Sequence, residues 1–247
     1  MDFHCHLDLY KDPFLVASEI VRSETFVLSV TTTPSAYEKT SAISSNKQFI
    51  ATAIGLHPQL VHQRASEVSQ INNWIRKTDF VGEVGLDGGS EYSRSWDTQI
   101  EIFKYVLNLS NNNGGRILSI HSRRAAGQVL DCLEQNSISN IPILHWFSGT
   151  VKEIKRANDI GCWFSVGPAM LLGKKGKELL RLMPKDKILL ETDGPFTTFK
   201  GEPYHPCDAE KYCVPIIAHE WSTSEEDVRS SLKINLENIL SKRHITI

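Results

Sequence analysis

The chain is predicted to fold as an α/β protein of the TIM type, a (β/α)8 barrel. Short apolar runs rich in β-branched residues recur along the sequence, and amphipathic segments separate them. The starts of these runs lie roughly 20 to 40 residues apart, which is typical of βα units. Several runs are almost continuously apolar, as are strands buried on both faces of a parallel sheet. The expected strands are residues 2–6, 26–30, 50–56, 80–86, 117–121, 141–145, 162–166 and 188–192.

Segments with helical periodicity lie between the expected strands. The strongest lies within 92–112, where Ile100, Phe103, Val106 and Leu107 recur at helical spacing. The expected helices are residues 13–22, 34–45, 65–77, 96–108, 125–135, 151–159 and 174–182. A doubly wound open sheet is the competing architecture, but no G-x-G-x-x-G motif follows the first expected strand. The pattern therefore favours the barrel, although the chain is slightly short for one.

No linker divides the sequence, so residues 1–247 are expected to form a single domain. The segment 194–211, rich in proline, follows the last expected strand and is predicted to be a long loop that shapes a substrate site. The tail, 214–247, is predicted to form two helices. The second would begin at Thr223 or Ser224, because Glu226 follows in capping-box spacing.

Composition and charge exclude several classes of protein. The formal net charge of -2 gives no global positive field, so any contact with nucleic acid requires a local patch. No apolar run approaches the length of a membrane span, and the N-terminus lacks the apolar core of a signal peptide. The five cysteines form no C-x-x-C pair, which argues against a disulfide framework or a zinc ribbon. We therefore expect a cytoplasmic protein with no membrane partner.

The first eight residues, M-D-F-H-C-H-L-D, contain two histidines at alternate positions. On a β-strand, His4 and His6 would point to the same face, and two imidazoles at a strand end make half of a metal site. A surface pair or an accident of sequence is the alternative interpretation of this fragment alone. Further candidate ligands elsewhere in the chain favour the metal site.

Metal-competent side chains recur at the ends of the expected strands. In a (β/α)8 barrel, functional side chains gather at the C-terminal ends of the strands. A single strand-end histidine is more often a hydrogen-bonded structural residue, but several at one rim indicate a metal site. The six candidate ligands are His4, His6, Glu83, His121, His145 and Asp193.

Six ligands exceed the three that a tetrahedral catalytic ion requires, so two divalent ions are expected, about 3.5–4 Å apart. Glu83, which is central in the strand order, is the natural bridge between them. Asp193 can hold one ion and also take a proton from the attacking water. Histidine favours Zn²⁺ or Mn²⁺ whereas carboxylate favours Mg²⁺, so the mixture leaves the ion open among the three.

The motifs D-F-H-C-H-L-D, G-L-H-P, G-E-V-G-L-D, I-H-S-R, H-W-F-S-G and E-T-D-G-P occur in this order. In this the chain resembles the TatD-type deoxyribonucleases, over residues 2 to about 240. The resemblance implies a TIM barrel of the amidohydrolase-like metal-dependent hydrolases. It also implies that one ion is held by His4, His6, Glu83 and Asp193, and the other by Glu83, His121 and His145. The expected activity is hydrolysis of DNA phosphodiesters, often from the 3′ end, with single-stranded DNA the favoured substrate.

The chain length and the E-T-D-G-P form are also similar to the TatD-like component of the bacterial Qat anti-phage defence system. This resemblance implies a role in antiviral defence and protein partners from a defence operon.

The sequence departs from the family at three places. Gln59 stands where the family usually has the second histidine of G-x-H-P-H, and Gly194 stands where serine or alanine is frequent. Gly88, Gly89 and Ser90 replace an aromatic or basic stretch after G-L-D. All six candidate ligands are retained, so the chemistry is expected to survive while the choice of substrate is open.

Two further residues are expected to contact substrate. Arg123 matches the family's H-x-R motif, and its guanidinium suits phosphate oxygens in bidentate fashion. His57 ends the third expected strand and could contact a phosphate or brace a ligand, although a histidine capping a turn is equally consistent. Asp87 is interpreted as a structural residue of the loop after the fourth strand.

Three functions remain open. A metal-dependent DNase is favoured by the two-metal set together with Arg123. A hydrolase of another small substrate is the second, but that class often bridges its ions with a carboxylated lysine, and no strand-end lysine is found. The third is a partner-gated or non-catalytic subunit of a defence complex, against which the intact ligands argue.

Overall fold

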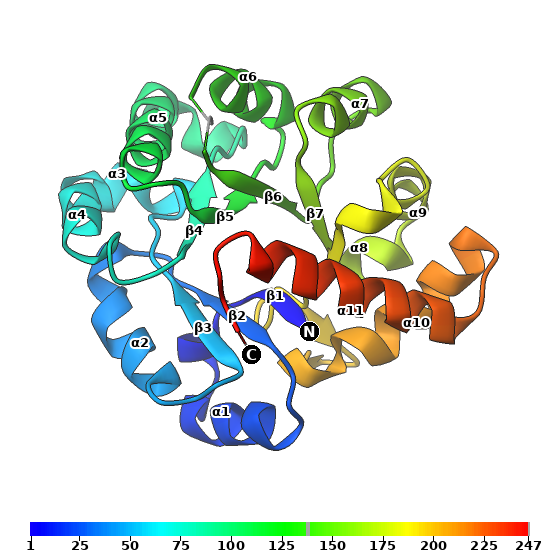
Figure 1. The fold of residues 1–247 in the computed structure, drawn as a ribbon. Coiled ribbons are helices and arrows are strands. Elements are labelled where there is room, and N and C mark those ends of the chain that lie inside the picture. Colours follow the sequence, from blue (N-terminus) through cyan, green and yellow to red (C-terminus); the bar gives the residue numbers. More distant parts are fainter. Residues whose placement is uncertain (137–138, 247) are drawn as a thin grey trace.

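The computed structural model describes residues 1–136 and 139–246 and confirms the barrel (Figure 1). A three-stranded parallel sheet is followed by a five-stranded parallel sheet, each in sequence order. The strands that form the barrel are β1 Asp2–Cys5, β2 Val27–Val30, β3 Ile50–Ala53, β4 Phe80–Gly85, β5 Ile117–His121, β6 Ile141–His145, β7 Trp163–Val166 and β8 Ile188–Leu190. Each lies within a strand expected from the apolar runs.

Backbone hydrogen bonds join the two sheets into a closed barrel. At one junction, Glu83 N–H donates to the Thr31 carbonyl at 3.0 Å, beside a bridge between Ile54 and Val81. At the other, Asp193 N–H donates to the His4 carbonyl at 2.8 Å. The buried Asp2 carboxylate strengthens this second junction, because it accepts from the His4 N–H and from the Thr192 hydroxyl. The first and last strands are thereby held side by side.

Helices pack against the strands: most of them surround the barrel on its outside, whereas the last helix of the chain crosses in front of the strands in this view (Figure 1). They are α1 Pro13–Arg22, α2 Tyr37–Ser44, α3 Val61–Arg64, α4 Ile71–Trp74, α5 Trp96–Asn112, α6 Ala126–Asn136, α7 Val151–Asp159, α8 Pro168–Leu172, α9 Lys174–Leu180, α10 Ala209–Trp221 and α11 Glu225–Ser241. Local sequence explains several starts: Asp12 caps α1, and Thr150 with Glu153 forms a capping box on α7. The short α3 and α8 were not expected from periodicity, and the expected helix 65–77 is a 3-10 segment, Ala65–Gln70, followed by α4.

Two expectations about the C-terminal region are wrong in detail. The segment 194–211, expected to be a long loop, contains a two-stranded hairpin, β9 Thr198–Phe199 and β10 Glu202–Pro203, and the first turn of α10. The second tail helix does begin after Ser224, but its cap partner is Asp227 rather than Glu226. The Ser224 hydroxyl accepts from the Asp227 N–H, three residues later, whereas a cap with Glu226 would have begun at Thr223.

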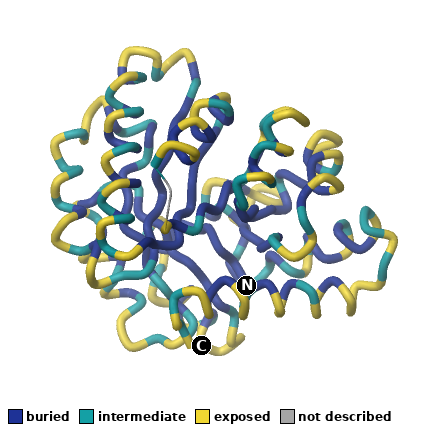
Figure 2. Tube along the Cα trace, turned by 45° about the horizontal axis from the view of Figure 1, so that its top comes forward, coloured by how far each residue is buried: buried dark blue, intermediate teal, exposed yellow. Residues whose placement is uncertain are grey.

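The core occupies the inside of the barrel and the layer between strands and helices (Figure 2). The barrel strands are almost entirely buried, and the outer faces of the helices are exposed (Figure 2). Burial of both strand faces explains why the strand sequences are continuously apolar rather than alternating. None of the helices in the part of the chain that the structure describes is long and apolar enough to cross a membrane.

Candidate metal centre and active site

The six candidate ligands meet at the C-terminal end of the barrel. They come from five strands and lie at or near the strand ends, with Glu83 two residues before the end of β4. All are buried except Asp193, whose side chain is 16% exposed. Gly85 allows the close approach of two of these strands. It has φ +134°, and a Cβ there would overlap the His121 carbonyl, so only glycine permits β4 to end against β5. Glu83 and His121 are thereby brought together.

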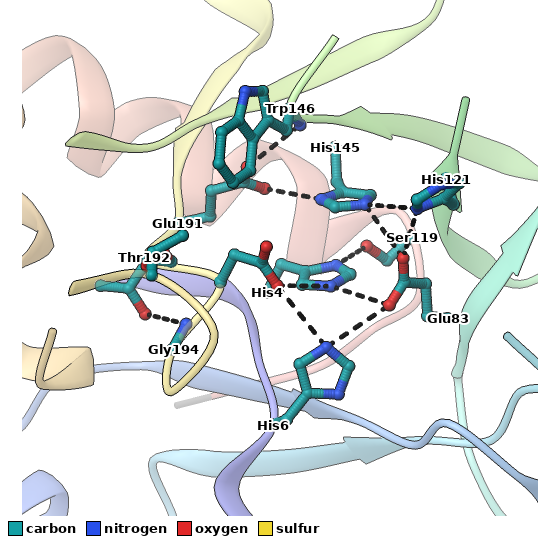
Figure 3. A network of polar contacts seen from close by, with 12 residues as sticks. His4, His6, Glu83, Ser119, His121, His145, Trp146, Glu191, Thr192 and Gly194 are labelled. Atoms are coloured by element: carbon teal, nitrogen blue, oxygen red, sulfur yellow. Dashed lines mark hydrogen bonds and ion pairs between the residues drawn. The ribbon is translucent and has the colours of Figure 1, made fainter. Parts of the chain in front are cut away.

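The Glu83 carboxylate lies at the centre of this group (Figure 3). Its Oε2 is 3.3 Å from Nε2 of His4 and 3.4 Å from Nε2 of His6. Its Oε1 is 2.8 Å from Nδ1 of His121 and 3.1 Å from Nε2 of His145. The two oxygens therefore face two different pairs of histidines, which is the arrangement that a bridging carboxylate requires.

Asp193 completes one side of the group. Its Oδ1 is 3.7 Å from Nε2 of His4 and 3.6 Å from Nε2 of His6. The residue adopts φ +55°, a backbone conformation that aspartate tolerates better than most residues. Because its N–H is bonded to the first strand, the carboxylate is fixed opposite Glu83.

Buried polar residues orient the histidines. The Asp87 Oδ2 accepts from Nε2 of His121 at 2.8 Å, so Nδ1 is the ring nitrogen of His121 that faces Glu83. The Ser119 hydroxyl contacts Nδ1 of His4 at 2.7 Å, which leaves Nε2 of His4 facing both carboxylates. Asp87, interpreted from sequence as a loop residue, thus also positions a candidate ligand.

Glu191 performs a similar task for His145. Its Oε1 accepts from the Trp146 N–H at 3.0 Å, and its Oε2 faces Nδ1 of His145 at 3.7 Å (Figure 3). The same Oε2 accepts from the Ser165 hydroxyl. Nε2 of His145 is consequently turned toward Glu83. Sequence reasoning missed Glu191 and Ser119; the only available signal was that each lies within an expected buried strand, where a polar residue requires a partner.

His57 lies beside these ligands but is bonded differently. Its Nε2 is 3.1 Å from Glu83 Oε1, while its Nδ1 accepts from the Gln59 N–H at 3.1 Å. A neutral imidazole that accepts at Nδ1 carries its proton on Nε2, so this nitrogen is a donor. The geometry favours His57 as a hydrogen-bond donor to an anion over His57 as a metal ligand.

Burial and the two carboxylates shift the pKa values in opposite directions. Burial lowers the pKa of His4 to about 4, so this imidazole is neutral and can donate a lone pair. Burial also acts on His6, but hydrogen bonds to Asp193 and Glu83 outweigh it and raise the pKa of His6 to about 9. The surrounding histidines hold the pKa of Glu83 well below its usual range against the effect of burial. The carboxylates are therefore ionised and attract cations.

The donor set fits divalent metal ions. Three buried imidazole nitrogens, Nε2 of His4, Nδ1 of His6 and Nδ1 of His145, have no hydrogen-bond partner among the described residues. The first of these points at two carboxylates and is the kind of atom that a metal would satisfy. Ligand atoms lie within 4.8 Å of one another in three groups: His4 with His6 and Asp193, His4 with Glu83 and His145, and His57 with Glu83 and His121.

These groups agree with the expected ligand sets only in part. The group of His4, His6 and Asp193 fits the first expected ion. The second expected ion does not match one group. His145 lies in a group with His4 and Glu83, whereas the histidine grouped with His121 and Glu83 is His57. Because Nδ1 of His57 accepts a hydrogen bond from the Gln59 N–H, its Nε2 carries the proton and has no lone pair for a metal ion. His121 and His145 are therefore the better metal ligands beside Glu83 Oε1.

The centre forms the floor of a cavity of about 670 Å³. Arg123 and His57, the two expected substrate contacts, both line it, together with Trp146 and Phe196. Phe196 is 62% exposed and packs edge-on against the His6 ring. The cavity therefore combines buried anions with a cation and an exposed aromatic ring at its wall.

The structure accounts for two of the sequence departures. Gln59 Nε2 donates to Asp87 Oδ2 at 2.8 Å, so it helps fix the carboxylate that orients His121. Gly194 leaves room for the Tyr10 hydroxyl, which donates to the Tyr204 carbonyl at 2.6 Å, and a Cβ on residue 194 would overlap that hydroxyl. Both substitutions thus belong to the local packing around the centre.

Known proteins share this fold and sequence pattern. The chain is 26% identical over 231 residues to the uncharacterized metal-dependent hydrolase YjjV of Escherichia coli (strain K12), covering 85% of this chain and 86% of that protein. It is 24% identical over 263 residues to the human protein named deoxyribonuclease TATDN3, covering 97% and 93%. The crystal structure of YjjV superposes with a TM-score of 0.83 at 21% identity, over 95% of each chain.

The barrel and its ring of histidines and carboxylates define the class of metal-dependent hydrolases. Within that class, the chain belongs to the family described as TatD related DNase, which matches residues 1–241.

Proposed function

We propose that this metal-dependent hydrolase cleaves phosphodiester bonds of DNA, from the 3′ end and with single-stranded DNA preferred. The observation that carries the proposal is the position of Glu83 between two pairs of histidines, with Asp193 opposite it and Arg123 on the wall of the same cavity. The printed name of the human relative, a deoxyribonuclease, supports the same substrate class.

Two divalent ions, Mg²⁺, Mn²⁺ or Zn²⁺, would be held by His4, His6 and Asp193 on one side and by His121 and His145 on the other, with Glu83 between them. When bound, such ions stabilise negative charge on the phosphate and on the leaving oxygen. Asp193 is the most exposed of the carboxylates and is therefore suited to accept the proton of the attacking water.

Substrate contacts follow from the cavity wall. Arg123 would pair with a phosphate oxygen, and the Nε2–H of His57 would donate to a second one. A base could stack on the exposed ring of Phe196. The scissile phosphate must descend to the buried Glu83, which a splayed single strand does more easily than a paired duplex. These features together favour a single-stranded end as substrate.

A different hydrolase activity is less well supported. Amidases and phosphotriesterases built on this scaffold often use a lysine at the metal bridge, and none of the described residues lining the cavity is a lysine. The bridging position is taken by Glu83. A non-catalytic role would not require the hydrogen bonds of Asp87 and Ser119, or the contact of Glu191 with His145, that orient the candidate ligands.

Two proposals concern the cellular location of the enzyme and its biological role. We infer from the E-T-D-G-P motif that the protein is the TatD-like component of a Qat anti-phage system, and we propose that it acts in the cytoplasm, as a single domain with operon-encoded partners. Phage plating on cells carrying the operon tests this. Loss of protection with Asp193→Asn is expected, and full protection by that variant would contradict a catalytic role in defence.

The substrate is tested with end-labelled oligonucleotides. The purified protein is expected to release labelled nucleotide from the 3′ end of single-stranded DNA faster than from duplex DNA or RNA. Arg123→Ala is expected to weaken substrate binding without changing metal content. Equal rates on all substrates would contradict the strand preference, and a loss of metal in Arg123→Ala would contradict its assignment to phosphate.

A further inference from the structure

Arg123, the cation proposed to meet the substrate phosphate, is already paired with a carboxylate at the wall of the cavity. Its Nη2 donates to Oε1 of Glu91 at 2.7 Å, and its Nε lies 3.6 Å from Oδ2 of the buried Asp87. The Arg123 side chain is 40% exposed and that of Glu91 is 49% exposed. Glu91 therefore occupies the Nη2 donor of Arg123, which would otherwise be open to a phosphate oxygen.

The loop after β4 is built to hold Glu91 there. Gly89 N–H donates to Asp87 Oδ1 at 2.8 Å, and Gly88 N–H donates to the Arg123 carbonyl at 2.9 Å. A Cβ on Gly88 would overlap the Arg124 carbonyl, so glycine lets this loop lie against the chain that carries Arg123. The loop and the arginine are thus fixed relative to each other.

Gly89 makes room for the carboxylate itself. A Cβ on residue 89 would lie 2.7–2.8 Å from the carboxylate oxygens of Glu91, because the Glu91 side chain folds back over the loop. Gly89 therefore leaves the space in which the Glu91 carboxylate meets Arg123.

We propose that Glu91 sets the affinity of the site for phosphate, as an internal carboxylate that competes with the substrate phosphate for Arg123. The inference rests on the proposed function, in which Arg123 contacts phosphate. Carboxylate and phosphate both match the planar fork of arginine, so the two anions exclude one another at the same donors. Because the pair is half-exposed, it is weak enough for a phosphate to displace.

The competition between Glu91 and phosphate for Arg123 should change the affinity for DNA by a measurable factor. Exposed arginine–carboxylate pairs of this kind change an equilibrium by about two- to fivefold. Removal of the competing carboxylate should therefore tighten the binding of an oligonucleotide by about that factor. The salt dependence of binding should also steepen, because Arg123 then contributes a full phosphate contact.

Two variants remove the contact by different routes. Glu91→Gln removes the charge, whereas Gly89→Ala displaces the flexible end of the Glu91 side chain and leaves the net charge unchanged. Gly89 has φ -62° and ψ 140°, which alanine adopts without strain. Glu225→Gln is the matched control, because it breaks a carboxylate–arginine pair of similar length, 2.9 Å to Arg229, on the distant helix α11.

The experiment measures equilibrium binding of a short single-stranded DNA to chelator-treated protein, by fluorescence anisotropy, at two salt concentrations. Glu91→Gln and Gly89→Ala are expected to bind about two- to fivefold more tightly than wild type, and Glu225→Gln to bind like wild type. The gain is expected to vanish in the Arg123→Ala background. Unchanged or weaker binding by both variants, or an equal gain in Glu225→Gln, would overturn the proposal.

Cleavage of the same DNA with metal restored separates this inference from the proposed function. Tighter binding through Arg123 without any cleavage would contradict the nuclease activity and leave the role of Glu91 standing. Cleavage by wild type with no gain in either variant would contradict the role of Glu91 alone.

Discussion

The Asp87 carboxylate accepts a hydrogen bond from Nε2 of His121 at 2.8 Å and so directs the other ring nitrogen of His121 toward Glu83. Hydrogen bonds from His121, Gln59 and the Gly89 N–H outweigh burial and lower the pKa of Asp87 to about 2, so it is an ionised acceptor. Asp87→Asn is expected to lower metal affinity roughly 10- to 100-fold, as the loss of such outer carboxylates does. Metal titration followed by activity checks this.

Asp186→Asn is the control for Asp87→Asn, because Asp186 is exposed and lines a second hollow, away from the candidate ligands. Equal metal affinity in wild type and Asp87→Asn would show that His121 needs no orienting carboxylate.

Glu83 is expected to couple the two proposed ions. Since its two oxygens face different pairs of histidines, Glu83→Ala should remove both ions together and lower activity by more than the roughly 100-fold expected for an outer-shell residue. Metal content per chain after dialysis measures this, with Glu67→Gln, which breaks the ion pair of Glu67 with Arg64, as the control. Retention of one tightly bound ion in Glu83→Ala would contradict the bridging position.

Gly194 and Tyr10 are expected to be energetically coupled. Gly194→Ala places a methyl group on the Tyr10 hydroxyl and should destabilise the protein by about 1–3 kcal/mol, the usual cost of overpacking. Tyr10→Phe removes that hydroxyl. The double variant should therefore lose at least about 0.5 kcal/mol less free energy of unfolding than the two single variants lose in sum. Urea unfolding of the four proteins gives the cycle. Strictly additive losses would mean that the two side chains do not compete for this space.

A pH-dependent contact anchors the segment that carries Phe196. Nε2 of His205 lies 3.0 Å from Glu19 Oε2 on α1. The contact with Cys207 raises the pKa of His205 above its usual 6.5, and Glu19 adds to this against the effect of burial. A raised folded-state pKa stabilises the protein fully below about pH 6.5, and this stabilisation is lost as the pH rises through the folded-state value.

Glu19→Gln should therefore lower the Tm most below about pH 6.5, by an amount equivalent to at most about 1 kcal/mol, and progressively less at higher pH. Thermal unfolding between about pH 5.5 and 8.5 measures the difference. The control is Glu225→Gln, which breaks an ion pair with an arginine and involves no histidine. The decrease in Tm of this control should therefore be the same at every pH in that range. A loss in Glu19→Gln that grows with pH would contradict the assignment.

Much of the fold could be predicted because buried parallel strands are continuously apolar. The runs that became β5 and β6 were predicted to the residue, since a polar ligand, His121 or His145, ends each one. The hairpin β9–β10 and the short α8 were not predicted. Few residues form each of them, and their positions depend on contacts with the barrel rather than on local periodicity.

The candidate ligands could be proposed from sequence because they lie at or near the C-terminal ends of strands, where the barrel gathers functional groups. The residues that orient these ligands could not be predicted from sequence. Ser119 and Glu191 act through His4 and His145, which are distant in sequence, and no spacing rule links them. The same holds for Glu91 and Arg123, whose pairing depends on how two glycines fold one loop onto another strand end.

The most direct test of a two-metal nuclease is metal-dependent loss of a 3′-end label from single-stranded DNA. Chelated protein is assayed after addition of Mg²⁺, Mn²⁺ or Zn²⁺, with Asp193→Asn from a parallel preparation. We predict release with at least one ion in the wild type and none in Asp193→Asn, although that variant still binds DNA through Arg123. Protein that holds two ions and yet releases no label with any of them would contradict the nuclease assignment.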